Sequence, residues 1–187
     1  DQEHKATFTY SGDDVIPVPD PTNPPVKPEG FVDVVFDKGA HGEFAANAVT
    51  KYFVNPKAGK TLADITKPGI DAADGWKFTG WDKKDTEEIK ANLTVTAQYK
   101  EKVVTTDPGD TDYAHVTFTT TKGTVTGQAE YWVLKNEKVT FAVPTVDLTG
   151  VTDYTFKAWD PAVKETYTAD QEHKATFTYS GDDVIPV

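Results

Sequence analysis

The chain carries the same eighteen residues at two places. Asp1–Val18 and Asp170–Val187 both read DQEHKATFTYSGDDVIPV, without a single difference, at an offset of 169 positions. Identity over such a length does not arise by chance, so we expect the sequence to hold one full period of a tandem array plus the overlap with the next. Identical repeats do not each carry a different active site. The repetition therefore adds length or multiplies one surface.

Composition favours a mostly β, extracellular protein. Hydrophobic residues make up 37% and aromatic residues 12% of the chain, enough to build hydrophobic cores and to argue against general disorder. Threonine often stands at alternate positions, as in VTFTTT, which is typical of the solvent-facing side of strands. There is no Cys and no Met, so packing must stabilise the units without disulfides or thiolate–metal sites.

The charge pattern excludes several partners. The net charge is −11, and every basic residue is Lys. A nucleic-acid-binding face needs a cluster of basic residues, which this sequence does not offer. An anionic membrane would repel such a surface, and no apolar run approaches the roughly 20 residues of a membrane helix. We therefore predict no nucleic-acid partner, no membrane insertion and a soluble monomer.

Prolines and repeated motifs divide the chain. The stretch Pro17–Gly30 holds six prolines, which favours an extended polyproline-like spacer over a sheet. An isolated strand before it would fray or pair with the sheet edge of another molecule. The predicted organisation is a closing strand of a preceding unit (1–18), a Pro-rich linker (19–30), repeat unit one (31–102), a short linker (103–112), and repeat unit two with its exit segment (113–187).

The two units follow one pattern. Trp76–Asp82 reads WKFTGWD and Tyr154–Asp160 reads YTFKAWD, while Pro68 in unit one corresponds to Pro144 in unit two. The middle segments differ. Lys60–Lys67 has apolar residues three apart and predicts one or two helical turns, whereas Lys138–Val143 alternates like a strand. The period thus contains two diverged relatives.

This pattern resembles the Listeria–Bacteroides repeat, the B-repeat of internalin-like surface proteins. The residues that carry the resemblance are Trp76, Phe78, Gly80, Trp81, Asp82, Ala91, Val95, Ala97 and Tyr99, and in unit two Tyr154, Phe156, Ala158, Trp159, Asp160, Ala169 and Tyr179. The tandem copying is also similar to the stalk ("periscope") repeats of Gram-positive adhesins, such as the streptococcal high-identity repeats. Unit two departs from the family pattern in two ways, with Ala158 in place of Gly and a shorter middle segment. We therefore do not extend to unit two the helix that the family pattern implies for the middle segment.

The resemblance implies a fold and a location. The expected fold class is mostly β, α+β, with two small β-grasp-like units in tandem as elongated beads on a rod. The expected location is extracellular, on a bacterial cell surface, anchored to the cell wall through the parent protein. The partners would be neighbouring repeat units of the same chain.

The expected cores are aromatic. Strict alternation places Trp76, Phe78 and Gly80 on one face of a strand and Trp81 on the other, so a bulge or strand end is needed to bury both tryptophans. Asp82 and Asp160 are expected to accept backbone amides in the following turns. The predicted core residues are Phe36, Trp76, Phe78, Trp81, Tyr99, Phe118, Tyr154, Phe156, Trp159 and Phe177.

No pattern predicts catalysis, a cofactor or a metal. The four histidines, His4, His41, His115 and His173, form no ligand-spaced pair, and no phosphate-binding glycine loop is present. Carboxylates gather at Asp107–Asp112 and Ser180–Asp183, where solvated turns are favoured over a calcium site. An intramolecular Lys–Asn isopeptide bond stays open by analogy only.

The predicted function is therefore a non-catalytic stalk that projects an adhesive domain. The alternative is a repeated low-affinity module for a host glycan or protein, with avidity from copy number. An exposed aromatic patch at the same place on both units would favour the alternative.

Overall fold

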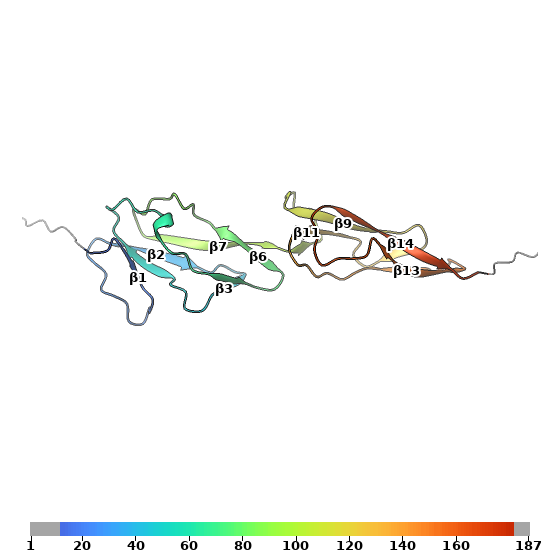
Figure 1. Cartoon of the computed structure of the whole chain (residues 1–187), viewed down its shortest axis with the longest axis horizontal. Coiled ribbons are helices and arrows are strands. Elements are labelled where there is room, and N and C mark those ends of the chain that lie inside the picture. Colours follow the sequence, from blue (N-terminus) through green and yellow to red (C-terminus); the bar gives the residue numbers. More distant parts are fainter. Residues whose placement is uncertain (1–11, 182–187) are drawn as a thin grey trace, which may run out of the picture. The chain divides into compact units, whose positions relative to one another are not determined.

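A computed structural model describes residues 12–181, and nearly all of its regular structure is β, as the alternating threonines predict (Figure 1). The chain divides into two units, 1–100 and 101–187, and each is described by itself. The one helical element among the described residues is the 3-10 turn η1 (Leu62–Asp64) in unit one. The helical turns predicted over Lys60–Lys67 are thus reduced to a single turn.

Unit one is built on a five-stranded sheet in the order β1-β4-β2-β7-β6. The central strands β2 and β7 are parallel, while β4 pairs antiparallel with both β1 and β2. A second, two-stranded sheet pairs β3 with β5. The bounds are β1 (Val15–Pro17), β2 (Val32–Asp37), β3 (Gly42–Phe44), β4 (Lys51–Val54), β5 (Ile70–Ala72), β6 (Trp76–Trp81) and β7 (Leu93–Glu101).

Unit two repeats this topology strand for strand. Its five-stranded sheet has the order β8-β11-β9-β14-β13, again with a parallel central pair, β9 and β14, and its small sheet pairs β10 with β12. The bounds are β8 (Val103–Val104), β9 (Tyr113–Thr119), β10 (Thr124–Thr126), β11 (Glu130–Leu134), β12 (Thr145–Asp147), β13 (Tyr154–Asp160) and β14 (Gln171–Tyr179). The correspondence inferred from the sequence pattern therefore extends to the strand order of both sheets.

A tyrosine on the fourth strand anchors each core in the same way. The hydroxyl of Tyr52 on β4 donates to the carbonyl of Thr66 at 2.7 Å, and that of Tyr131 on β11 donates to the carbonyl of Ala142 at 2.7 Å. Both acceptors lie two residues before the corresponding prolines, Pro68 and Pro144. Burial raises the pKa of both tyrosines above the ordinary value, so both hydroxyls remain donors at neutral pH.

The Pro-rich stretch is not a spacer between units, which corrects the predicted boundaries. Strand β1 aligns Val15 with Val54 of β4, and Val18 is buried against Phe31 and Phe53. Residues 12–18 thus belong to unit one, and 19–30 form the connection from β1 to β2. The part of the predicted closing strand in 1–11 lies outside the described residues.

The second predicted linker is corrected in the same way. Val103–Val104 forms β8 and pairs antiparallel with Val133 and Trp132 of β11, so these residues belong to the sheet of unit two. Lys102 alone separates β7 from β8 along the chain. A strand of two residues shows no alternation, which is why the sequence pattern did not reveal it.

Three of the ten predicted core aromatics are buried, namely Phe36, Phe118 and Trp159. Phe156 is a wrong prediction, since 36% of its surface is exposed. The register of β13 against β14 shifts between Phe156 and Ala158, and Trp159 beyond this irregularity is buried. The remaining six are half-buried: Trp76, Phe78, Trp81, Tyr99, Tyr154 and Phe177.

One local expectation also differs from the structure. The segment Lys138–Val143 forms no strand, although Val139 is buried and Val143 is 45% exposed. The alternation of apolar and polar residues in this segment therefore goes with the burial of Val139 in the core, and not with strand pairing. The chain after β2 passes through β3, which pairs with β5, and then returns antiparallel along β2 as β4.

Asp33 is expected to make the stability of unit one depend on pH. Its carboxylate lies 3.1 Å from Nζ of Lys27 and 3.4 Å from Nζ of Lys51. Burial alone would raise the pKa of Asp33, but hydrogen bonds and charge from the two lysines outweigh it and lower the pKa. The stabilisation is therefore complete above the ordinary pKa of 3.8 and disappears as the pH falls through the lower native value.

We expect Asp33→Asn to reduce the free energy of unfolding of unit one by about 0.5–1 kcal/mol at pH 7, and by nothing measurable at pH 2. Urea titrations at both pH values, followed by the amide signals of β2 and β4, measure the difference. The exposed Asp74→Asn serves as control. An equal loss for Asp33→Asn at both pH values would show that its ion pairs contribute nothing.

Candidate functional site

The core of unit two contains a histidine, His173 on β14, with no solvent exposure. It lies opposite Phe118 of β9, where unit one has Val95 opposite Phe36 of β2. Its ring stacks on Phe118 at 5.0 Å and 20°. The sequence identified His173 but not its burial, because a polar residue in an alternating strand is normally assigned to the solvent face.

Each polar group of this histidine has a partner. Nδ1 contacts the carbonyl of Pro161, which only accepts, so Nδ1 carries a proton. Nε2 lies 3.2 Å from the hydroxyl of Tyr167, which itself accepts the amide of Lys164 at 3.2 Å. A neutral imidazole that accepts the Tyr167 proton at Nε2 satisfies all of these groups. The His173 ring and Tyr167 are both buried, which indicates a structural role for this network.

We expect His173→Val, which installs the residue of unit one, to cost about 1–3 kcal/mol of unit two's stability, because Tyr167 and the Pro161 carbonyl lose a buried partner. The double variant with Tyr167→Phe removes one orphaned group and should be less destabilised than the sum of the two single variants. Urea titrations of the wild type and three variants give the coupling energy. Strict additivity would contradict the network.

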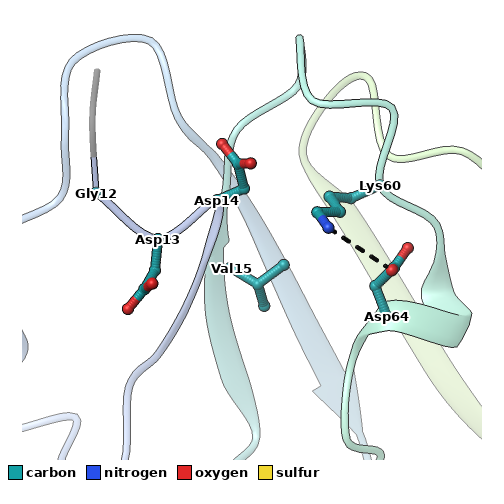
Figure 2. Close-up of a pocket in the computed structure, with 6 residues that line it drawn as sticks. All are labelled: Gly12, Asp13, Asp14, Val15, Lys60 and Asp64. Carbon is teal, nitrogen blue, oxygen red and sulfur yellow. Dashed lines mark ion pairs between the residues drawn. The ribbon is translucent and has the colours of Figure 1, made fainter.

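A shallow hollow of about 400 Å³ in unit one is the next candidate. It is lined by Gly12, Asp13, Asp14 and Val15, before and at the start of β1, by Lys60 shortly before η1, and by Asp64, the last residue of η1 (Figure 2). Asp14 and Lys60 border the hollow, whereas the side chain of Asp13 points away from Lys60 and Asp64 (Figure 2). Of the three carboxylates that line the hollow, only that of Asp64 lies within ion-pair distance of Lys60.

Asp14, Asp64 and Lys60 in this hollow are engaged in contacts within the fold. Asp14 accepts the side-chain amide of Asn55 at 2.8 Å. Asp64 accepts the backbone amide of Thr61 at 2.8 Å and lies 3.8 Å from Nζ of Lys60. The backbone hydrogen bond from Thr61 is the main reason that the pKa of Asp64 lies below its ordinary value. A carboxylate held ionised in a turn is a poor general acid, so Asp64 is unsuited to that role.

Aromatic side chains on the last two strands form a second kind of surface. In unit one, Trp76 on β6 is covered by His41, whose ring stacks on it at 3.4 Å and 6°. Phe78 lies 5.9 Å from Tyr99, and the Tyr99 hydroxyl donates to the carbonyl of Lys38 in the turn after β2. That turn therefore closes over the aromatic cluster of unit one.

The corresponding cluster of unit two is more open. Tyr154 lies 5.3 Å from Tyr179, and Nζ of Lys122 stands 3.9 Å from the centre of the Tyr154 ring. Tyr179 is 52% exposed and Phe156 is 36% exposed. The aromatics thus occupy the same place in both units, but only unit two has large exposed aromatics there among the described residues.

The acidic segment Asp107–Asp112 forms turns. Asp107 accepts the amide of Gly109 at 2.8 Å and Asp110 accepts that of Asp112 at 2.9 Å, the arrangement favoured over calcium. Within residues 12–181 no group of three His, Cys, Asp or Glu side chains is placed to hold a metal ion. Asp82 accepts the amide of Thr96 across the sheet at 2.7 Å, and not one in the following turn as predicted.

Both units place their first strand in the same position, at the outer edge of the fourth strand. In unit one β1 adds to the edge of β4, and in unit two β8 adds to the edge of β11. The sequence patterns did not reveal this feature, because β1 and β8 are only three and two residues long. Each sheet is thus extended by the chain segment that precedes its own second strand.

Comparisons with protein-family models, with curated proteins and with solved structures found no match for this chain. No helix in the described part of the chain has the length and apolar character needed to span a bilayer.

Proposed function

We propose that this chain is a spacer: a segment of tandem β units that sets the distance of another domain from a bacterial surface. The observation that carries the proposal is the unchanged repeat of Asp1–Val18 at Asp170–Val187, joined to two units of one topology. Selection for a longer array explains exact copying, since each added period increases the length and adds no new binding or catalytic site. The closed histidine network and the engaged carboxylates of the hollow are in keeping with a structural role.

The experiment compares chains of one, two and three 169-residue periods by small-angle X-ray scattering. We expect the maximum dimension to rise by a constant increment for each added period while the cross-section stays the same. A maximum dimension that grows only as the cube root of mass would describe a compact particle and would overturn the spacer function.

A second candidate function rests on the open aromatic cluster of unit two. Exposed Tyr179 and Phe156 offer flat apolar surfaces to which a sugar ring or an apolar side chain can bind. One such patch in each period would give a weak site multiplied by copy number. This function requires that Tyr179→Ala abolish binding to a glycan array or host-cell surface, while the exposed Val26→Ala in unit one leaves it unchanged.

A further inference from the structure

The chain contains one Asp-Gly sequence, Asp74–Gly75, and no Asn-Gly. The backbone nitrogen that follows an aspartate can attack the carboxyl carbon of that side chain, and the product is a five-membered ring. Glycine favours this attack because it has no Cβ to hinder the close approach of its backbone. Asp74 is therefore the aspartate of this chain whose sequence is best suited to the reaction.

The structure places this pair at the centre of an exposed turn. The amide of Trp76 donates to the carbonyl of Ala73 at 3.0 Å, so Asp74 and Gly75 are the two central residues of the turn between β5 and β6. Both residues are exposed, and Gly75 has φ +80. A Cβ built at Gly75 would meet no atom within 4 Å. The Asp74 side chain and an attacking water molecule therefore have open space beside the turn.

Neither reacting group is held by a competing hydrogen bond in the part of the chain that the structure describes. The amide of Gly75 donates to no acceptor there, and no amide donates to the Asp74 carboxylate. Other turn aspartates differ, because each accepts the amide two residues further along, which fixes the carboxylate: Asp20, Asp37, Asp107, Asp110 and Asp147. The carboxyl carbon of Asp74 is thus free to rotate towards the Gly75 nitrogen.

We propose that Asp74 is a site of spontaneous isoaspartate formation. The Gly75 nitrogen forms a bond to Cγ of Asp74, while the hydroxyl of the carboxyl group and the amide proton leave as water. Water then adds to the main-chain carbonyl carbon of Asp74 and breaks its bond to the Gly75 nitrogen, so that the backbone runs through Cβ and Cγ. Addition of water to the other ring carbonyl returns Asp74. The net change is an isomerisation that needs no reactant other than water.

The product loosens the aromatic cover of unit one. Isoaspartate adds one atom to the backbone of a turn that is closed by the hydrogen bond from Trp76 to Ala73. Both ends of this turn contact His41: the Ala73 amide donates to the His41 carbonyl at 2.8 Å, and the Trp76 ring stacks on the His41 ring at 3.4 Å. A longer turn moves Ala73 and Trp76 apart, so we expect the stack to loosen. Unit two has Asp153 where unit one has Gly75, so its corresponding turn contains no Asp-Gly.

The test ages the purified chain at physiological pH and temperature and measures isoaspartate by methyl transfer from S-adenosylmethionine with an isoaspartyl methyltransferase. Electron-transfer fragmentation of the digested chain then locates the modified residue. We expect isoaspartate to form at Asp74 at least about tenfold faster than at Asp71, because Asp71 precedes Ala72, which has a Cβ, and pairs with Glu43 in the small sheet. Equal rates at the two positions would overturn the proposal.

Two conservative variants assign the signal. Asp74→Glu keeps the charge but requires a six-membered ring, so it should lose the isoaspartate signal of this turn. Asp71→Glu is the matched control and should leave that signal at the wild-type rate. Methyl transfer that continues unchanged in Asp74→Glu would show that the reaction takes place at another residue.

A synthetic peptide of residues 70–79 separates the contribution of the turn from that of the sequence. Because the turn leaves both reacting groups free, the folded chain should form isoaspartate at a rate comparable to that of the peptide. A folded chain that reacts far more slowly would show that the turn protects Asp74, against the proposal. In aged chains the amide signals of Ala73 and Trp76 should split in proportion to the isoaspartate fraction, and unsplit signals would contradict the loosening of the stack on His41.

Discussion

Replacement of Trp159 by alanine is expected to lower the free energy of unfolding of unit two by about 3–5 kcal/mol. The indole is 8% exposed, lies 5.0 Å from Phe118 at 75° and 5.4 Å from Phe156, and donates from Nε1 to the carbonyl of Pro144 at 3.1 Å. Truncation therefore leaves a large cavity and removes a buried donor. Urea titrations followed by amide signals of β9 and β14 measure the loss.

Two comparisons separate the causes. Trp159→Phe keeps an aromatic ring but removes the hydrogen bond to Pro144, and should cost about 1–3 kcal/mol. Trp81→Ala in unit one should cost less than Trp159→Ala, because Trp81 is only half-buried although it lies 5.0 Å from Phe36. A loss below about 1 kcal/mol for Trp159→Ala would place this tryptophan in a surface role.

The regular strands were predictable because alternation and repetition reinforce one another. The motif shared by Trp76–Asp82 and Tyr154–Asp160 forms a strand in each unit, β6 and β13. The same reasoning failed for Phe156 itself. Alternation assigns a residue to a face, but it does not tell how far along an edge strand the core extends.

The first strand of each unit was not predictable from local pattern. Val15–Pro17 and Val103–Val104 are too short for periodicity, and the adjoining prolines suggested a linker. Pro17 is tolerated because β1 is an edge strand that lacks a neighbour on one side. The buried His173 was missed for a related reason, since its partners come from the irregular segment 161–167 and leave no periodic signal.

Replacement of Gly123 by alanine is expected to destabilise unit two by about 2–5 kcal/mol, because strain and overpacking act together. Gly123 precedes β10 with φ +69, a left-handed conformation that costs a residue with a Cβ about 1–2 kcal/mol. A Cβ at this position would also lie 2.0 Å from the carbonyl oxygen of Asp147, the residue that pairs with Thr124 in the small sheet. Because that contact is with backbone, β10 and β12 must separate to relieve it.

Gly150 provides the matched control. It has φ +80 in the turn after β12, but a Cβ there would meet no atom within 4 Å. Gly150→Ala should therefore cost only the conformational strain of about 1–2 kcal/mol. Urea titrations of the two variants, with amide exchange at Thr124 and Val146 as a local readout, measure the difference. Equal losses would mean that the small sheet yields freely at Gly123, and that the close approach of β10 to β12 adds nothing to the stability of unit two.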